Sequence, residues 1–273
     1  LFRMIRRGGY GRGFLTRLGL YSRLDLEKME GKRNVWFHAV SVGEVYVAIR
    51  VLERLREFDK GWNFVFTTNT STGYRIAKRE LGHTDTVLYF PSELYFVMKR
   101  AVGVICPVML VLTECEIWPN LIRMVKGSGG KVAIVNARLS DSSFRGYRAA
   151  KIVFGPVMSS IDCILAQTET DRSRFIALGA RSASVEAIGS CKYDMFPGSA
   201  RTDQLVGELA RYGFRESDPV LMGGSTWSGE EAILLEAFSA AREKSERLKL
   251  ILIPRHAERA GEVEKEILAA GYS

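Results

Sequence analysis

Three glutamates stand where carboxylates could do chemistry. Glu44 closes the segment HAVSVGE, in which an apolar run turns on a glycine and the carboxylate then opens a helix. Glu114 and Glu116 follow the apolar run that ends at Thr113, and residues two apart on an extended chain point to the same side. Two like charges after a buried strand are costly unless a basic group or a substrate meets them, so a site is expected there. For Glu44, stabilisation of a helix dipole is the competing explanation.

Further polar groups follow other apolar runs. The segment VNARLSDSSFRGY begins at Val135, SCKYD begins at Ser190, and GGSTWSGEE is a glycine-rich turn before a helix. The run that ends in IPRH supplies a guanidinium, which suits a phosphate, as does a helix N-terminus. The alternatives are an N-cap pair with an acidic first turn for the glycine-rich segment, and a helix-capping or interdomain salt bridge for Arg255.

The elements that must position these groups alternate between strand and helix. In the first part of the chain, apolar runs predict strands at 34–40, 63–68, 108–113, 131–136 and 163–167. A second series predicts strands at 220–224 and 248–253 with helices at 229–247 and 260–270. Such alternation is typical of a parallel sheet covered by helices on both faces. Ligands bind such sheets at the carboxyl ends of the strands, where the candidate groups lie.

The same pattern predicts four segments. They are a basic and apolar membrane-proximal segment at 1–33, a Rossmann-like domain at 34–195, an interdomain linker at 196–218 and a partial second domain at 219–273. Two strand–helix units are too few to cover both faces of an independent parallel sheet. We therefore expect the chain to stop within its second domain.

The composition favours an anionic partner and offers no metal site. Lys and Arg total 39 against 31 Asp and Glu, a formal net charge of +8. The four cysteines share no CxxC spacing and are expected to be reduced thiols in the core, and the three histidines are not paired at short spacing. The longest apolar stretch, 101–113, is too short to span a bilayer.

The N-terminal residues 1–17 mix arginines with aromatic and aliphatic side chains. That mixture suits an anionic membrane surface, and a solvated basic tail is the alternative. Four glycines in this segment argue against a continuous amphipathic helix.

Six blocks carry a family resemblance when taken in order: HAVSVGE, TECEIWPN, VNARLS, SCKYD, GGSTWSGEE and IPRH. From about Val35 to Arg259 the chain resembles the bacterial 3-deoxy-D-manno-octulosonic acid (Kdo) transferases of lipid A, glycosyltransferase family 30. Ser190 and Cys191 replace the Asn and Leu usual in the family, and Trp227 stands where a His is common. The family's later nucleotide-binding segments and its N-terminal anchor do not occur in this sequence, as expected of a truncated chain.

The resemblance implies an α/β protein of GT-B architecture, with two Rossmann-like domains that have parallel sheets, the second incomplete here. It implies metal-independent, inverting transfer of Kdo from CMP-Kdo to a lipid A precursor (lipid IVA) without a cofactor, on the cytoplasmic face of the bacterial inner membrane. The family's catalytic positions fall on Glu44 as general base, Glu114 and Lys192. Its substrate-binding positions fall on Ser41, Gly43, Glu116, Asn136, Arg138 and Ser140. Its donor-binding positions fall on Pro254, Arg255, Ser225, Thr226 and Glu230.

Two other functions fit the residues. Neither a fold nor a phosphate-binding arginine names the sugar, so another GT-B glycosyltransferase with a different nucleotide sugar fits the pattern. A non-catalytic fragment that binds nucleotides or an anionic surface fits the basic charge. Nucleic acid is disfavoured, because the interleaved basic and aromatic signatures of RNA-binding modules are missing. The oligomeric state and the number of Kdo residues transferred stay open.

Overall fold

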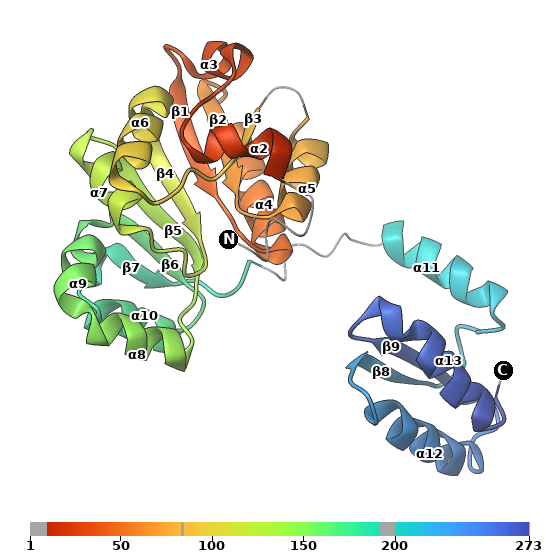
Figure 1. The fold of residues 1–273 in the computed structure, drawn as a ribbon. Coiled ribbons are helices and arrows are strands. Elements are labelled where there is room, and N and C mark those ends of the chain that lie inside the picture. Colours follow the sequence, from red (N-terminus) through yellow and green to blue (C-terminus); the bar gives the residue numbers. More distant parts are fainter. Residues whose placement is uncertain (1–9, 83–84, 192–199, 273) are drawn as a thin grey trace. The chain divides into compact units, whose positions relative to one another are not determined.

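The chain forms two compact units. The computed structural model describes residues 10–82, 85–191 and 200–272. Contacts divide the chain into Leu1–Phe196 and Pro197–Ser273, and each unit is an α/β assembly of its own (Figure 1). The first nine residues, which carry part of the basic N-terminal segment, lie outside the described residues.

The first unit is built on a seven-stranded parallel sheet in the order β3-β2-β1-β4-β5-β6-β7 (Figure 1). Its strands are β1 (Arg33–His38), β2 (Trp62–Thr68), β3 (Thr86–Tyr89), β4 (Pro107–Thr113), β5 (Lys131–Ala137), β6 (Cys163–Ala166) and β7 (Val185–Ala187). The predicted parallel α/β fold is confirmed. The sequence pattern misses β3 and β7, because four and three residues are too few to show a period.

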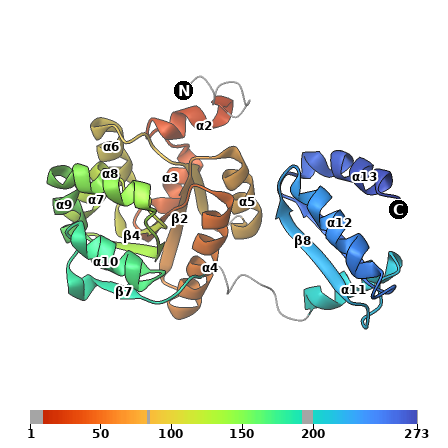
Figure 2. The ribbon, with the colours of Figure 1, turned by 90° about the horizontal axis from the view of Figure 1, so that it is seen from below.

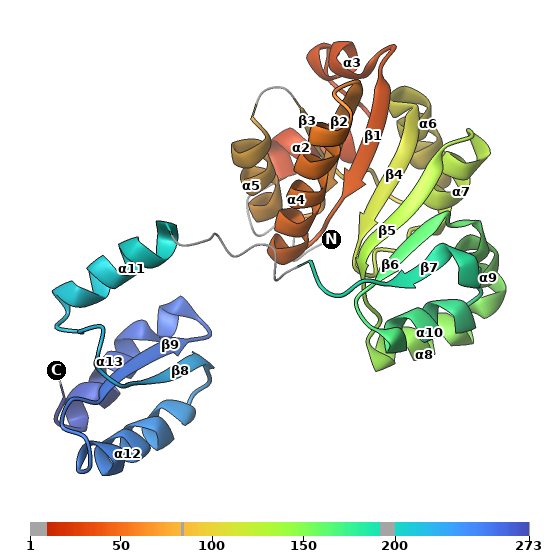
Figure 3. The same ribbon diagram turned by 180° about the vertical axis from the view of Figure 1, so that it is seen from behind.

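Helices cover both faces of this sheet, as Figures 1 and 3 show from opposite sides. Neighbouring residues of β1 point to opposite faces. Trp36 packs into the core that α6 and α7 cover, and Phe37 into the core that α4 and α5 cover. The helices of this unit are α2 (Tyr10–Arg17), α3 (Arg23–Met29), α4 (Val42–Phe58), α5 (Ser71–Leu81), α6 (Tyr95–Ile105), α7 (Pro119–Gly127), α8 (Asp141–Ala149), α9 (Lys151–Ser160) and α10 (Glu169–Ala177), with a 3₁₀ turn at Ser182–Ser184.

Helix α2 forms where the glycines were expected to prevent a helix. Gly13 lies against the ring of Tyr89 in β3, and a Cβ added there would collide with that ring. The missing side chain therefore lets α2 approach the edge of the sheet closely. The energy of this contact offsets the low helix propensity of glycine.

Polar residues just beyond the strands begin the helices. The side-chain oxygens of Ser41, Thr70, Ser140 and Thr168 each accept a hydrogen bond from the backbone N–H three residues on. Each of these N-caps lies within three residues of the end of β1, β2, β5 or β6. Some of the polar residues that follow the strands in the sequence therefore serve as helix N-caps.

The described residues of the second unit form two parallel strands and three α-helices. They are α11 (Ala200–Arg211), β8 (Val220–Thr226), α12 (Glu230–Arg242), β9 (Lys249–Pro254), the 3₁₀ turn Ala257–Arg259 and α13 (Ala260–Ala269). Figure 2 shows the three helices and β8, and Figure 3 shows β9 beside β8. Helix α11 occupies most of the described part of the segment predicted as a linker. Helix α12 ends five residues earlier than predicted, because no apolar side chain follows until Leu248.

The cysteines are less buried than the sequence predicts. All four cysteines are free thiols, and Cys106 is exposed at the left-handed C-cap of α6, so its assignment to the core is wrong. The other three are half-buried. Within the described ranges, no helix has both the length and the apolar character needed to cross a membrane.

Asn34 ties three parts of the first unit together from the start of β1. Its Nδ2 donates to the carbonyls of Met29 (2.9 Å) and Ile105 (2.5 Å), and its Oδ1 accepts from Asn63 Nδ2 (2.6 Å). Asn34→Ala should lower the free energy of unfolding by about 2–3 kcal/mol, because it leaves buried carbonyls without a donor. Urea denaturation measures this loss. Asn63→Ala removes one hydrogen bond of a half-buried residue and should cost only about 1 kcal/mol; equal costs would contradict the bridging role.

Candidate active site at the switch point of the sheet

The site lies where the strand order reverses. After β1 the chain adds β2 and β3 on one side, then returns to place β4 on the other side of β1. In open α/β sheets the crevice at such a switch point, beyond the carboxyl ends of the strands, is where ligands bind. Glu44 follows β1, and Glu114 and Glu116 follow β4, so all three predicted glutamates flank this point.

Glu44 is fixed by a capping box at the start of α4. Its Oε1 accepts from the N–H of Ser41 (3.1 Å), and the Ser41 hydroxyl accepts from the N–H of Glu44 (3.2 Å). Its Oε2 accepts from the N–H of Val40 (3.1 Å), and the side chain is only 7% exposed. The carboxylate is therefore held rigidly, with both oxygens bonded to backbone donors.

Thr113, the last residue of β4, links the two strands at the switch point. Its hydroxyl oxygen lies 3.2 Å from Oε2 of Glu44 and 3.0 Å from the carbonyl oxygen of His38. A hydroxyl has one hydrogen, so it donates to one of these acceptors at a time. Sequence reasoning missed Thr113, which reads as an ordinary strand residue and shows its role only once β1 and β4 are paired.

The chain turns sharply after β4, and the expected extended spacing of the two glutamates is wrong. Glu114 has φ +53°, a left-handed conformation that is uncommon without glycine, and Glu116 N–H donates to the carbonyl of Thr113 (3.2 Å). The two carboxylates consequently meet different partners. Oε2 of Glu114 lies 3.7 Å from Nη2 of Arg138, while Oε2 of Glu116 accepts from the indole N–H of Trp118 (3.0 Å).

Glu116 sits in an apolar and acidic environment. Burial, followed by the charge of Glu44, raises the pKa of Glu116 from 4.5 to about 7, against the lowering effect of the Trp118 hydrogen bond. The Trp118 ring packs on Phe90, whose ring in turn stacks on His38 with centroids 3.9 Å apart. His38 and Trp118 thus pack with Phe90, and Trp118 also contacts a site carboxyl.

Asn136 is buried and supports the segment that leads to Lys192. Its φ is +53°, its Oδ1 accepts from the N–H of Cys191 (3.1 Å), and its carbonyl accepts from Nε2 of Gln167 (3.1 Å). The hydroxyl of Ser190 lies 3.4 Å from the same Oδ1. Lys192 itself lies outside the described residues. Asn136 is buried and therefore influences the site by holding the backbone at Cys191, and not as part of the exposed surface of the site.

The remaining predicted positions of this unit differ in exposure. Ser140 is the exposed N-cap of α8, and Arg138 is exposed beyond its contact with Glu114. At Gly43, in the first turn of α4, an added Cβ would meet nothing within 4 Å. Packing inside the unit thus does not require glycine there, which leaves open space beside Glu44.

The donor-binding positions predicted in the second unit separate into buried and exposed groups. Thr226 is buried and donates to Oε1 of Glu231 (2.7 Å), which also pairs with Arg259 (2.9 Å). The Arg259 hydrogen bond holds the pKa of Glu231 down at about 2. Ser225, Glu230 and Arg255 are exposed and Pro254 is half-buried.

The exposed group surrounds the turn between β8 and α12. Ser225 has φ +62°, Oε2 of Glu230 accepts from the N–H of Trp227 (2.8 Å), and the Arg255 guanidinium lies 5.1 Å from the centre of the Trp227 ring. A guanidinium beside an exposed aromatic ring and a helix start can meet an anionic group.

No arrangement of three or more His, Cys, Asp or Glu side chains that could hold a metal ion occurs in the described part of the chain. The three glutamates at the switch point contact Thr113, Arg138 and Trp118 instead.

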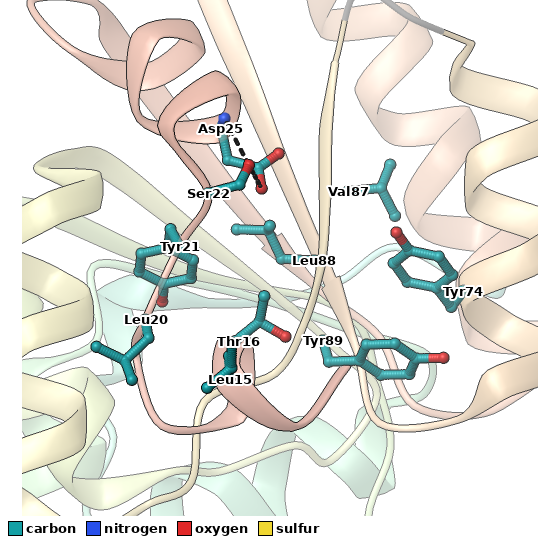
Figure 4. A pocket seen from close by; sticks show the side chains of 10 residues that line it. All are labelled: Leu15, Thr16, Leu20, Tyr21, Ser22, Asp25, Tyr74, Val87, Leu88 and Tyr89. Atoms are coloured by element: carbon teal, nitrogen blue, oxygen red, sulfur yellow. Dashed lines mark hydrogen bonds between the residues drawn. The ribbon is translucent and has the colours of Figure 1, made fainter. Parts of the chain in front are cut away.

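A cavity of about 490 Å³ lies between edge strand β3, helix α5 and residues 15–25 (Figure 4). The stacked rings of Tyr74 and Tyr89, with centroids 4.6 Å apart, form one wall. The aliphatic side chains of Leu15, Leu20 and Leu88 form much of the rest. The sequence gives no sign of this cavity, because its walls come from four separate elements.

A family model described as 3-Deoxy-D-manno-octulosonic-acid transferase (kdotransferase) matches residues 12–195. A 3-deoxy-D-manno-octulosonic acid transferase of Haemophilus influenzae is 30% identical over 92% of this chain and 57% of that protein. The corresponding protein of Bordetella pertussis is 31% identical over 88% and 56%. A bifunctional glycosyltransferase/methyltransferase of Fusobacterium nucleatum is 27% identical over 89% and 37%. The chain thus spans about half the length of the first two relatives.

Solved structures share the fold at low sequence identity. A putative UDP-N-acetylglucosamine 2-epimerase from Listeria monocytogenes has a TM-score of 0.60 and 11% identity, covering 89% of this chain and 67% of that one. A glycosyltransferase from Rickettsia africae has a TM-score of 0.51 and 13% identity, covering 88% and 66%. These likenesses confirm the predicted GT-B fold class and carry no information on the substrate.

Replacing Glu116 by Gln should make stability less dependent on pH. Because folding raises the pKa of Glu116 from 4.5 to about 7, the wild-type protein loses stability as pH rises through that window. Gln cannot ionise, so the gain of the variant over wild type should be roughly 2 kcal/mol larger at pH 8 than at pH 5. Urea unfolding at the two pH values measures it. Glu114→Gln keeps the titrating carboxyl of Glu116 and removes only the weakest of the influences that raise its pKa, so its gain should have the same sign but be much smaller; gains of equal size in both variants would refute the assignment.

Proposed function

Because the chain belongs to the 3-deoxy-D-manno-octulosonic-acid transferase family, we propose that it forms the catalytic edge of an enzyme that transfers Kdo from CMP-Kdo to a lipid A precursor. The observation that carries the proposal is the rigid Glu44 carboxylate at the switch point, with open space at Gly43 beside it. An acceptor hydroxyl that binds in this space would lie beside a carboxylate whose position is fixed.

Glu44 is the general base in this proposal. It takes the proton from a sugar hydroxyl of the acceptor as that oxygen attacks the anomeric carbon of Kdo, and the C–O bond to CMP breaks with inversion. Thr113 supports this role, because its single hydrogen can turn from Oε2 of Glu44 to the carbonyl of His38. That rotation would free a lone pair of the carboxylate for the incoming proton.

The cations around the site suit two anionic substrates. Arg138, 58% exposed although 3.7 Å from Glu114, can also reach a ligand, and Lys192 is proposed to oppose the negative charge of the donor. In the second unit, Arg255 and the start of α12 are proposed to meet the phosphate of CMP, with Pro254, Ser225 and Glu230 shaping that turn. The buried Thr226 supports the turn from below through Glu231.

The acceptor lipid would approach from the side of α2. Exposed apolar side chains there include Phe14, Leu15 and Leu18, and the start of α6 adds Leu94, Tyr95 and Phe96. The two segments are joined by the hydrogen bond from the N–H of Ser92 to the carbonyl of Arg17 (2.8 Å). With the net charge of +8, this apolar surface suits the anionic cytoplasmic face of the inner membrane.

The role of Glu44 is tested by Glu44→Gln in the intact natural protein that contains this chain. Transfer of labelled Kdo from CMP-Kdo to a tetraacylated lipid A precursor should fall by about 10²- to 10⁴-fold, the usual contribution of a positioned base. Some stability is also lost, since Glu44 closes the capping box. Asn34→Ala is the matched control, because it destabilises the opposite end of β1 and should keep activity. A Glu44→Gln enzyme with near-wild-type turnover would end the assignment.

Membrane docking is tested with vesicles of phosphatidylethanolamine and phosphatidylglycerol. The double variant Leu15→Ser/Phe96→Ser should bind several-fold more weakly than wild type in a sedimentation assay, and wild-type binding should weaken as salt is added. Phe58→Ser/Ile152→Ser removes two apolar side chains outside this surface that are more exposed than Leu15 and Phe96, and this variant should bind normally. Binding that is absent, or indifferent to salt, would contradict the docking proposal.

A further inference from the structure

His38 presents an unused ring nitrogen to the site. The residue ends β1, is completely buried, and has no hydrogen-bond partner at Nε2. Burial lowers the pKa of His38 from 6.5 to about 3, so the ring is neutral at physiological pH. The polar atom near Nε2 is Oε2 of Glu116, 3.9 Å away. A buried nitrogen facing a carboxyl across this gap needs an explanation.

The other ring nitrogen decides which one carries the proton. Nδ1 lies 3.1 Å from the carbonyl oxygen of Thr67 and 3.1 Å from its hydroxyl oxygen. A carbonyl oxygen can only accept, so Nδ1 carries the hydrogen and donates it there. The Thr67 hydroxyl has a separate acceptor, the carbonyl of Phe37 (3.1 Å). In this tautomer Nε2 of His38 is a bare acceptor.

An acceptor nitrogen opposite Oε2 of Glu116 disfavours an ionised carboxylate there, because two sets of lone pairs would face each other. A carboxylic acid resolves this, since its O–H can donate to Nε2 once the gap closes by about 1 Å to ordinary hydrogen-bond length. We propose that His38 is a positioning residue that holds Glu116 as the neutral acid, with the Glu116 O–H directed at Nε2.

The charges around Glu116 agree with a neutral carboxyl. Glu44 faces it from α4 and Glu114 lies on its own turn, and both are negative when ionised. The thiol of Cys115 and the hydroxyl of Tyr147 on α8 also lie near it, and the pKa of each is raised, first by burial. Arg138, beyond β5, contacts Glu114 at 3.7 Å. Within the described residues, no Lys or Arg side chain pairs with Glu116, and His38, which lies 3.9 Å from it, is neutral.

The consequence for catalysis rests on the proposed function. Kdo carries a carboxylate and CMP carries a phosphate, so the donor brings negative charge to the carboxyl ends of the strands, where Glu44 and Glu114 already lie. A neutral Glu116, with its single O–H directed at Nε2 of His38, removes one of three repulsive charges from this edge. The anionic donor would thus bind more tightly to the form of the protein in which Glu116 is protonated.

The test begins with the free protein, where no activity is needed. With ¹⁵N-labelled histidine and only three histidines in the chain, the ring nitrogens of His38 can be followed by NMR. The expected result is a proton on Nδ1 at every pH, and an Nε2 signal that shifts near pH 7 as Glu116 loses its proton. That shift should be absent in Glu116→Gln, whose amide donates but does not titrate. In Glu93→Gln, a control at another half-buried carboxyl whose pKa burial raises, it should persist.

A proton on Nε2, or an Nε2 signal that ignores pH in the wild type, would overturn the proposal. The kinetic arm then uses the intact natural protein. Wild-type kcat/KM for CMP-Kdo should fall by about tenfold per pH unit above the Glu116 transition, mainly through KM, while Glu116→Gln should lack this decline. An NMR transition without any transfer activity would instead reject the proposed function and leave the His38–Glu116 contact standing.

Discussion

The first unit depends on how three carboxyl groups are accommodated within a few residues of the point where β1 and β4 meet. Like charges in a poorly solvated place repel, and each glutamate here solves the problem differently. Glu44 accepts backbone and hydroxyl hydrogen bonds, Glu114 lies beside Arg138, and burial favours the neutral form of Glu116. The arrangement brings together one carboxylate fixed by hydrogen bonds, one carboxylate beside a cation and one carboxyl whose pKa is raised, so the three groups differ in the chemistry that each can perform.

In each unit the backbone is strained near the carboxyl ends of strands. Among the described residues, four that are not glycine have positive φ, and three of them are Glu114, Asn136 and Ser225. Each lies at or just beyond the carboxyl end of a strand, and β5 and β8 carry register shifts at Asn136 and Ser225. Such conformations cost on the order of 1–3 kcal/mol and persist only when surrounding contacts enforce them. Here the enforcing contacts are the Cys191 N–H on Asn136 and the sheet bonds beside each bend.

The sequence predicts the sheet, its helices and the edge that carries the polar groups, because period and strand-end polarity are local properties. It does not predict that Glu114 and Glu116 diverge, since the left-handed turn at Glu114 shows no glycine signature. Thr113, the His38–Glu116 contact and the Tyr74–Tyr89 cavity depend on which strands pair and which helices cover them. The short strand β3 is the clearest example: too small to be detected, it forms the edge on which α2 rests.

Glu44 links the folding of the unit to the chemistry proposed for it. Its carboxylate closes the capping box that starts α4, the 17-residue helix that covers β1, β2 and β4, so the hydrogen bonds that stabilise the unit also fix the orientation of the proposed base. Both of its oxygens are bonded to backbone donors, so the proposed proton transfer requires an adjustment in a neighbouring group. The Thr113 hydroxyl is suited to that adjustment, because it has two acceptors and one hydrogen. The proposed mechanism therefore requires the rotation of a single O–H bond and no rearrangement of the strands or of α4.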